Sequence, residues 1–491
     1  MNAPPGDPGA AAVSELVIVS NRLPLRRTGD EWTTSAGGLV TAMLPIATAT
    51  PCSWIGWLGE AEAGDPTTAT APASGGAPSE PELPMELSLA GVRYIPVALS
   101  AEEVESFYEG FSNAALWPLY HDALRPPQYD HQWWKSYRSV NRRFAEAVCR
   151  TAAHGATVWV HDYQLHLVPG LVRERRPDLR IGFFLHIPFP PVELFEQLPW
   201  RVPLLEGTLG ADLIGFQTEA YADNFRRAVE RLVGSRVVDD RVRFEGRTVV
   251  VGSFPISIDV AEAAAMAADE AVIRRAREIR AAIGPTRRLL LGVDRLDYTK
   301  GIDRRFSALA ELYESGRLDP REVAMVQIAV PSREDAAGYA ELRDEIDRLA
   351  GSINGRFASI GAPVLHYLYR SIDPVELAAL YVAADVMVVT PLRDGMNLVA
   401  KEYVAGHPSD DGVLVLSEFA GAAREFEDAV LVNPFDERAV AAAIERAITM
   451  DPDERSERLR RLRSVLEAAD VHVWASSFLQ ALRADSWDDN W

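Results

Sequence analysis

The sequence predicts an α/β protein built from two doubly wound units of parallel sheet. Short apolar runs rich in Val, Ile and Leu alternate with longer segments of helical periodicity. Continuous apolar runs of this kind are typical of strands that helices cover on both faces. The length of 491 residues, with 48% hydrophobic and 25% charged residues, is that of an ordinary globular protein of two or three domains.

Ten apolar runs are the expected strands, and they fall into two groups separated by a charged helical stretch at 269–283. The first group lies at 16–20, 157–161, 181–187, 213–216 and 249–254. The second group lies at 289–293, 323–330, 386–390, 413–416 and 430–432. This grouping predicts a first domain over 15–256, a second over 257–470, and a C-terminal helix and tail over 471–491.

Two segments lack this pattern and are rich in Ala, Pro, Gly, Ser and Thr. Residues 1–14 are therefore expected to be a disordered tail, and residues 60–84 a mobile insertion. The start of the chain lacks a basic segment followed by an apolar one, so we expect no signal peptide.

The composition excludes several classes of function. A net charge of −21 argues against a general nucleic-acid binder, although a local cluster of Arg and Lys can still bind phosphate. The longest apolar runs are too short for a membrane helix. Cys52 and Cys149 have no metal or redox spacing. We therefore expect a cytoplasmic protein that acts on small molecules, away from nucleic acid and membrane.

Polar residues that follow the first strand are candidates for a ligand site, because ligands of open α/β sheets bind outside the carboxyl ends of the strands. Arg22 ends the motif Ser-Asn-Arg, and Gly37 and Gly38 precede an apolar helix. Glycines at a helix start let the backbone approach an anion and offer it free N–H groups. The same pair also fits a plain tight turn.

Asp162 and His186 follow two further strands, where a carboxylate and an imidazole could orient substrate hydroxyls or share proton work. His161 and His166 lie close by in the sequence. Their spacing matches no standard zinc pattern, so no metal site is expected. We interpret His161 and His166 as core histidines whose hydrogen bonds are satisfied.

The second half carries the stronger signal. Arg295 and Lys300 lie in one short loop after the strand at 289–293, where they could converge on a diphosphate. Arginine supplies a planar bidentate fork and lysine a mobile point charge, so the pair could neutralise a leaving group. The alternative is an ordinary solvated loop.

The segment 390–402 follows another strand and predicts a helix N-terminus that binds phosphate. Asn397 is a good N-cap, which leaves Leu398, Val399 and Ala400 with unpaired N–H groups in the first turn. Glu402, about one turn further on, could accept hydrogen bonds from ribose hydroxyls. Asp394 in the preceding loop could hold hydroxyls of a transferred sugar.

The longer motifs closely resemble those of the trehalose-6-phosphate synthases, in the order that this family shows, from about Leu16 to Phe478. The motifs are SNR at 20–22, SAGGL at 35–39, FSNAALWP at 111–118, HDYQL at 161–165, GFFLHIPFP at 182–190, DRLDYTKG at 294–301, TPLRDGMNLVAKEYVA at 390–405 and SEFAGAA at 417–423. The resemblance implies a GT-B fold, in which two Rossmann-like domains face each other across a cleft and a C-terminal helix crosses back to the first.

The resemblance also implies the roles of individual residues. The acceptor pocket would be lined by Arg22, Tyr108, Trp117, Asp162 and Arg333. The donor nucleotide-sugar would be bound by Gly37, Gly38, His186, Arg295, Lys300, Ile328, Ile372, Asp394, Gly395, Met396, Asn397, Leu398, Val399 and Glu402. The residues implied in catalysis are Arg295, Lys300, His186 and Asp162.

The implied reaction moves glucose from a nucleotide diphosphate donor, UDP- or GDP-glucose, to glucose 6-phosphate with retention at the anomeric carbon. The family has no agreed carboxylate nucleophile, and a same-face, internal-return route is implied. Arg295 and Lys300 would stabilise the leaving diphosphate, so neither a metal nor a cofactor is expected. Trehalose 6-phosphate would be released as such, because no phosphatase segment follows the transferase motifs.

Three alternatives stay open at this point. A glucosylglycerol-phosphate synthase would keep the donor site and change the acceptor. A relative that couples cyclitols departs at the donor motifs, which are intact here. An inactive regulatory module would show lesions among the phosphate-binding residues, and Arg22, Arg295, Lys300, Arg333 and Glu402 are all present. The donor base, UDP, GDP or ADP, is undetermined, and a homo-oligomer is one expectation for the assembly.

Overall fold

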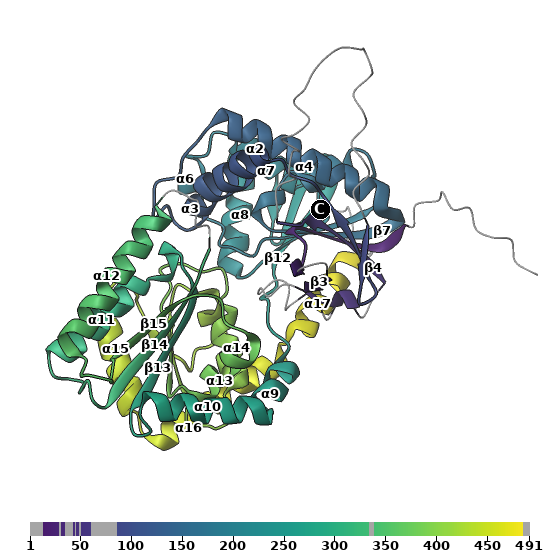
Figure 1. Ribbon diagram of the computed structural model, residues 1–491. Coiled ribbons are helices and arrows are strands. Elements are labelled where there is room, and N and C mark those ends of the chain that lie inside the picture. Colours follow the sequence, from purple (N-terminus) through teal and green to yellow (C-terminus); the bar gives the residue numbers. More distant parts are fainter. Residues whose placement is uncertain are drawn as a thin grey trace, which may run out of the picture. The chain divides into compact units, whose positions relative to one another are not determined.

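The computed structural model describes residues 13–28, 31–34, 43–44, 46–48, 51–59, 86–332 and 338–484. The chain divides into two compact units, the first comprising Met1–Ser253 with Ser477–Trp491 and the second Phe254–Ser476. Each unit contains its own parallel sheet with helices packed on it (Figure 1). The predicted α/β class is confirmed. Residues 1–12 of the expected tail and the whole expected insertion, 60–84, lie outside the described residues.

The described residues of the first unit form a ten-stranded sheet in the order β10-β11-β12-β9-β8-β7-β1-β4-β6-β5. The strands are β1 (Ser14–Arg22), β4 (Cys52–Trp57), β5 (Leu87–Leu89), β6 (Val92–Pro96), β7 (Ala152–His161), β8 (Arg180–Phe184), β9 (Leu213–Phe216), β10 (Val237–Val238), β11 (Arg241–Phe244) and β12 (Arg247–Ser253). The stretch from β12 to β6 is parallel throughout, and β2 (Leu25–Thr28) and β3 (Glu31–Thr34) form a separate hairpin.

The chain order of this parallel stretch reverses between β1 and β7, because the chain first builds outward through β4 and β6 and then returns to the other side of β1. In a doubly wound sheet this switch point leaves a crevice outside the carboxyl ends of the two strands. Arg22 ends β1, and Asp162 directly follows β7. Two of the residues implied in acceptor binding therefore flank the switch point of the first sheet.

Several helices of very different length pack on this sheet. They are α2 (Ala101–Glu103), the π-helix η1 (Val104–Leu116), α3 (Trp117–Tyr120), α4 (His131–Thr151), η2 (Tyr163–Leu165), α5 (Val168–Arg173), α6 (Val192–Phe195), α7 (Arg201–Thr208) and α8 (Glu219–Leu232). The two longest, α4 and α8, begin at conventional caps. The side chain of Asp130 accepts from the N–H groups of Gln132 and Trp133 at the start of α4, and Thr218 caps α8.

The second unit contains a six-stranded sheet in the order β15-β14-β13-β16-β17-β18, with all its described pairs parallel. The strands are β13 (Arg288–Arg295), β14 (Val323–Val330), β15 (Leu365–Tyr369), β16 (Val386–Val389), β17 (Val413–Ser417) and β18 (Val430–Val432). Its switch point lies between β13 and β16. These two strands carry Arg295 and the segment from Thr390 onward at their carboxyl ends.

Helices cover both faces of the second sheet. Figure 1 shows α11 (Ile302–Glu314), α12 (Tyr339–Phe357) and α15 (Glu437–Thr449) on one side of the strands, with α10 (Glu270–Ile283), α13 (Pro374–Ala383) and α14 (Leu398–Gly406) on the other. The remaining elements are α9 (Val260–Ala268), η3 (Tyr298–Lys300), η4 (Gly421–Arg424) and α16 (Pro452–Ala468). Burial on both faces explains the unbroken apolar runs of these strands, such as VAMVQIAV in β14.

The last helix, α17 (Val471–Arg483), begins in the second unit and ends in the first. Within the first unit its Phe478 ring stacks on Trp159 with centroids 4.7 Å apart. Gly182 and Gly215 admit this ring, because a Cβ at either position would come within 2.7 Å of it. The predicted crossing of the C-terminal helix to the first unit is thus confirmed.

All ten expected strands are present, but several have different bounds; β7, for example, begins at Ala152 rather than Thr157. The run at 181–187 was expected to be a single strand, but β8 ends at Phe184. Leu185 still donates to the Gly215 carbonyl, after which Pro188 and Pro190, which lack N–H groups, cannot continue the ladder. No helix within the described ranges is long and apolar enough to cross a membrane.

Candidate active site

The switch point of the first unit holds Arg22 against an aromatic and a glycine. The Arg22 guanidinium lies over the Trp57 ring, 5.4 Å from its centroid. A Cβ at Gly59, which has φ +93°, would come within 1.8 Å of the guanidinium, so the absence of a side chain there makes room for it. Arg22 itself is exposed. A planar, solvent-facing guanidinium supported from behind is suited to bind phosphate.

The π-helix η1 places Tyr108 beside this arginine. The Tyr108 ring meets Trp57 edge to face at 5.6 Å. Trp117 directly follows η1 and is buried, with its ring 4.1 Å from that of His121 and 5.8 Å from that of Tyr163. Turns bonded i to i+5 are wider than α-helical turns, are rare in proteins and occur often at functional sites.

Asp162 adopts a strained backbone conformation between β7 and η2. Its φ is +75°, a region that costs a residue with a Cβ roughly 1–3 kcal/mol. Its own N–H donates to the Phe184 carbonyl at 2.8 Å, and its Oδ1 accepts from the His186 N–H at 3.2 Å. These two bonds join the ends of β7 and β8, and they bring Asp162 and His186 together as the sequence predicts.

His186 is half-buried and pairs with His161. Nε2 of His186 lies 3.0 Å from Nδ1 of His161, and burial lowers the pKa of His186 to about 3. Burial, followed by the neighbouring His186, lowers the pKa of His161 well below its ordinary value. Both rings are therefore neutral at physiological pH.

The interpretation of the two neighbouring histidines as satisfied core residues is right for one and wrong for the other. His166 is buried, and its two ring nitrogens bond Tyr120 and Thr208, each at 2.9 Å. His161 is also buried, but its Nε2 has no hydrogen-bond partner. Within the described residues no three His, Cys, Asp or Glu side chains form a group suited to a metal.

The second unit brings its predicted phosphate residues together at its switch point. Lys300, in η3 after β13, donates from Nζ to Asp394 Oδ2 at 2.6 Å. The same oxygen accepts from Asn397 Nδ2 at 3.1 Å, so the loops after β13 and β16 are joined. Arg295 ends β13 and is exposed. Lysine and arginine thus lie in one loop at the carboxyl edge of the sheet.

Arg305, a buried arginine that the sequence analysis did not identify, supports the loop that carries Arg295 and Lys300. Arg305, on α11, is fully buried and donates to Asp294 Oδ2 and Gln327 Oε1 at 2.7 Å each, and to Thr390 Oγ1 at 3.1 Å. It therefore ties together β13, β14 and the end of β16. The signal for it was Asp294, a carboxylate directly after an apolar strand that needed a buried partner.

The N-terminus of α14 has the predicted cap, with one correction. Asn397 has φ +99°, and its side chain accepts from the Ala400 N–H at 3.0 Å. Ala400 was expected to offer a free N–H to phosphate, but the cap already occupies it. The amides of Leu398 and Val399, in the first turn, stay the predicted anion-binding groups.

The loop before α14 depends on a close backbone approach. A Cβ at Gly421 would lie 2.0 Å from the Gly395 carbonyl oxygen, so only glycine fits there. Gly421 N–H donates to the Asp394 carbonyl and Ala422 N–H to that of Met396. Met396 is buried, which anchors the loop in the core.

Glu402 lies one turn into α14 and is held by a tyrosine. The Tyr381 hydroxyl donates to Glu402 Oε2 at 2.7 Å. Burial raises the pKa of Glu402, and the hydrogen bond from Tyr381 partly offsets this rise. The next residue back, Lys401, is fully buried and donates to the Ile256 carbonyl while pairing with Glu425 at 2.7 Å.

Of the other residues implied in donor and acceptor binding, some have a defined position in the fold and the rest lie outside the described ranges. Ile328 is buried near the carboxyl end of β14, and Ile372 is half-buried shortly after β15. Both therefore lie toward the edge of the sheet that carries Arg295. Gly37, Gly38 and Arg333 lie outside the described residues.

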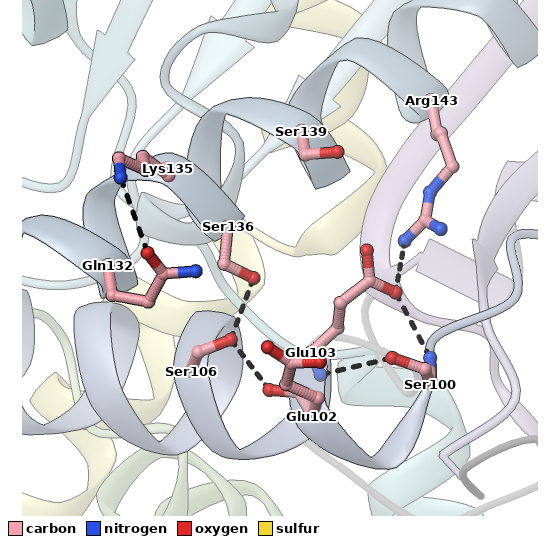
Figure 2. A pocket seen from close by; sticks show the side chains of 9 residues that line it. All are labelled: Ser100, Glu102, Glu103, Ser106, Gln132, Lys135, Ser136, Ser139 and Arg143. Atoms are coloured by element: carbon pink, nitrogen blue, oxygen red, sulfur yellow. Dashed lines mark hydrogen bonds and ion pairs between the residues drawn. The ribbon is translucent and has the colours of Figure 1, made fainter.

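A separate pocket on the first unit contains none of these residues. It has a volume of about 430 Å³ and lies between the α2–η1 segment and α4 (Figure 2). Its lining is polar throughout, and its side chains already bond one another: Ser106 donates to Ser136 at 2.8 Å, and Arg143 pairs with Glu103 at 2.7 Å. Without an apolar or aromatic wall, it is a poor candidate for the main ligand site.

Two doubly wound units, each with polar residues at its switch point, define the chain as an enzyme of the GT-B class of glycosyltransferases. Residues 14–484 match the model of glycosyltransferase family 20. The chain belongs to this family.

Several named proteins are similar to this chain over nearly its full length. A trehalose-6-phosphate synthase of Mycolicibacterium gilvum is 52% identical over 96% of this chain and 94% of its own length. A UDP-forming alpha,alpha-trehalose-phosphate synthase of Burkholderia xenovorans, solved in complex with glucose-6-phosphate, is 34% identical, with a TM-score of 0.85 over 96% of this chain and all of the other. An E. coli protein solved with UDP-2-fluoro glucose is 35% identical, with a TM-score of 0.85 over 95% and 98%.

Proposed function

We propose that this glycosyltransferase makes α,α-trehalose 6-phosphate from a nucleotide diphosphate glucose, UDP- or GDP-glucose, and glucose 6-phosphate. The observation that carries the proposal is the cationic loop of Arg295 and Lys300, which shares the switch point of the second unit with the N-terminus of α14. A diphosphate is the ligand that such an arrangement favours. The ligands of the two solved relatives, glucose-6-phosphate and UDP-2-fluoro glucose, support the same pair of substrates.

In this proposal the first unit binds the acceptor. Arg22, together with Arg333 of the second unit, binds the phosphate of glucose 6-phosphate, and Asp162 accepts from its hydroxyls. Tyr108 and Trp117 contribute the aromatic wall of the pocket. The exposed guanidinium of Arg22 supports the phosphate role, because the Trp57 ring beneath it holds it in one orientation.

The second unit binds the donor. The amides of Leu398 and Val399 receive the diphosphate together with Gly38 of the first unit, and Glu402 accepts from the ribose. Ile328 and Ile372 pack on the nucleobase. Asp394 binds hydroxyls of the transferred glucose, as does His186 of the first unit. Asp394 accepts a hydrogen bond from Lys300 Nζ, which links the proposed glucose contact to the proposed diphosphate contact.

The proposed chemistry retains the configuration of the anomeric carbon. The acceptor hydroxyl attacks the anomeric carbon on the face from which the diphosphate departs, and a phosphate oxygen takes the proton of that hydroxyl. Arg295 and Lys300 stabilise the charge that builds on the leaving diphosphate, the task that a metal ion performs in other transferases. The reaction then requires neither a metal nor a cofactor.

The test is an end-point assay of the purified protein with glucose 6-phosphate and, separately, UDP-, GDP- and ADP-glucose in the presence of EDTA. Mass spectrometry should detect trehalose 6-phosphate with one donor, and NMR of the product should show the α,α linkage. Nucleotide binding without product from any donor would contradict the proposal. It would favour another acceptor, such as glycerol 3-phosphate, or a regulatory role.

The proposal extends to the cell, where a cytoplasmic location suits an enzyme whose substrates are cytoplasmic metabolites. A homo-oligomer stays a prediction, which light scattering of the purified protein would check.

A further inference from the structure

The side chains of His161 and His186 meet at the carboxyl edge of the first sheet, with one ring nitrogen of each within hydrogen-bond distance of the other. His161 is the last residue of β7, and its register partner on β8 is Phe184. His186 follows two residues later, which brings the two rings to a centroid distance of 5.3 Å and Nδ1 of His161 to 3.0 Å from Nε2 of His186. The two nitrogens are therefore hydrogen-bonded.

Only one proton lies between these nitrogens. Burial lowers the pKa of both rings, that of His186 to about 3, so each imidazole is neutral and carries a single N–H group. One ring must donate and the other must accept. The direction of this bond decides which nitrogen of His186 carries its proton.

The surroundings of His161 decide the direction. If His186 donated, His161 would carry its own proton on Nε2, which is buried with no hydrogen-bond partner. Buried N–H groups without an acceptor are rare in native proteins, and acceptors left without a donor are less so. The favoured arrangement has the proton of His161 on Nδ1, where it is bonded, and leaves only a lone pair on the buried Nε2.

We propose that His161 is a positioning residue for the transferase reaction: it donates from Nδ1 to His186 Nε2 and thereby fixes His186 as the tautomer protonated at Nδ1. His186 then presents its ring to the transferred glucose as a hydrogen-bond donor in one orientation. This inference rests on the proposed function, which assigns the glucose contact to His186. No proton passes between the two rings during the reaction.

The backbone supports the same role. The His186 N–H donates to Asp162 Oδ1 at 3.2 Å, so His186 is held at its main chain by one candidate site residue and at its ring by His161. Groups oriented before substrate binds lose little entropy in the transition state. A small rotation of the His186 ring would remove that advantage.

His166 is the matched comparison in the same unit. It is as buried as His161, but both of its ring nitrogens are bonded, to Tyr120 and Thr208, neither of which is a candidate site residue. That is the pattern of a histidine that serves the core alone. His161 instead makes its one hydrogen bond to a site residue and leaves its other nitrogen unsatisfied, as local rules are broken where function requires it.

The first test measures the tautomers directly in the intact, unmodified protein. Two-dimensional 15N–1H NMR of the histidine-labelled full chain, assigned with His186→Ala and His161→Asn, separates protonated from unprotonated ring nitrogens. We expect His186 to be protonated at Nδ1 and bare at Nε2. A protonated His186 Nε2 would overturn the proposal, and so would an imidazolium at either position at neutral pH.

The second test measures coupling. His161→Phe should lower kcat roughly tenfold or more in the parent chain, but by no more than about twofold when His186 is already alanine. His161→Asn, which keeps a donor near the Nδ1 position, should restore most of the loss. His166→Phe is the control, and its effect should be additive with His186→Ala.

Additive losses for His161→Phe and His186→Ala would overturn the positioning role and leave His161 as a core residue. Circular dichroism and Tm establish that each variant is folded. The two proposals fail separately: a parent chain that makes no trehalose 6-phosphate contradicts the proposed function, whereas the tautomer of His186 is read without any turnover.

Discussion

At the scale of single residues, the candidate site divides into groups that contact ligand and groups that hold them. Arg295 and Arg22 are exposed at the ends of β13 and β1, whereas Arg305 is fully buried. The buried arginine bonds three acceptors from three strands or strand ends, which fixes the loop that carries Lys300. Exposure therefore separates the arginines proposed to bind phosphate from the arginine that supports the site.

Arg295→Ala should lower kcat by about 10²–10³, because it removes a charge aimed at the leaving diphosphate, a loss of roughly 3–4 kcal/mol of transition-state stabilisation. Steady-state kinetics with the accepted donor measures the effect. The control is Arg304→Ala on α11, which removes an arginine bonded to the Phe435 carbonyl. A loss below about tenfold for Arg295→Ala would contradict its role.

Nucleotide binding should depend on pH through Glu402. Burial holds the pKa of this carboxyl above its ordinary value, and the Tyr381 hydroxyl lowers it. The raised pKa means that the folded state favours the neutral carboxyl. The contribution of Glu402 to the free energy of unfolding is therefore lost as pH rises through that pKa. In the proposed function, ribose binding needs the ionised carboxylate. UDP affinity should therefore increase as pH rises through the pKa of Glu402.

Tyr381→Phe should move this binding transition to higher pH, because it removes the donor that stabilises the carboxylate. Isothermal titration of UDP across the acidic-to-neutral range measures the midpoint. Tyr403→Phe is the control, since the Tyr403 hydroxyl donates to the Ala384 carbonyl instead. Equal midpoints for Tyr381→Phe and the parent chain would show that Glu402 does not control the pH dependence.

Residue-level reasoning from sequence identified Asp162, His186, Lys300 and Asp394 because each follows an apolar run that ends at the same edge of a sheet. It could not find the side chains that hold them in place, such as His161 beside His186 and Arg305 beneath the Lys300 loop. His161 was interpreted as a satisfied core histidine because nothing in the spacing reveals which ring nitrogen lacks a bond. Arg305 meets Thr390, 85 residues away in the chain, only through the fold.

At the scale of elements, the first residues of α14 affect both the stability of the fold and the candidate donor site. Its N-cap, Asn397, lies in the left-handed region at φ +99°, where asparagine and glycine are tolerated and alanine is strained. The same residue caps Ala400 and contacts Asp394. One side chain thus defines both the start of the helix and the position of the loop before it.

Asn397→Ala should lower the free energy of unfolding by about 2–4 kcal/mol, from the lost cap and the strained φ together. Asn397→Gly loses the cap and relieves the strain, so its cost should be about 1 kcal/mol or less. Urea unfolding of both variants measures the difference. Equal costs would show that the left-handed conformation contributes nothing.

Strand prediction succeeded for runs rich in Val, Ile, Leu and Phe, and it failed for short strands and for strands of mixed composition. The ten predicted strands are dominated by these apolar residues, although several contain a Gly or Ser. β4, with the sequence CSWIGW, is fully buried but contains Ser and Gly, and β15, LHYLY, is only partly buried. The π-helix η1 was not predicted either, because its composition does not distinguish i to i+5 from i to i+4 bonding.

At the scale of the whole molecule, the two units differ in how the chain builds them. The second is one continuous segment, Phe254–Ser476, whereas the first needs residues from both ends of the chain. Phe478 and Leu482 are fully buried in the first unit, and Phe478 lies against Trp159, Gly182 and Gly215. Burial of one such aromatic is worth about 3–5 kcal/mol.

A chain truncated after Ser476 should therefore lose stability in the first unit alone. We expect the thermal transition of that unit to fall or disappear, while UDP still raises the Tm of the second, because ligand bound only to the folded state stabilises it. Scanning calorimetry with and without UDP measures both. A chain that ends at Ala484 keeps α17 whole and is the control; an unchanged first transition in the shorter chain would contradict the prediction.

The same discontinuity has a consequence during synthesis. The ribosome completes Met1–Ser253 first. Phe478, which packs in this unit, emerges only after the entire second unit has been translated. At bacterial or eukaryotic elongation rates the delay is roughly 10–45 s. Throughout that interval the surface at Gly182 and Gly215 that Phe478 covers stays exposed in the nascent chain. The first unit is thus synthesised first but completed last. We expect nascent-chain chaperones to bind this unit during that interval.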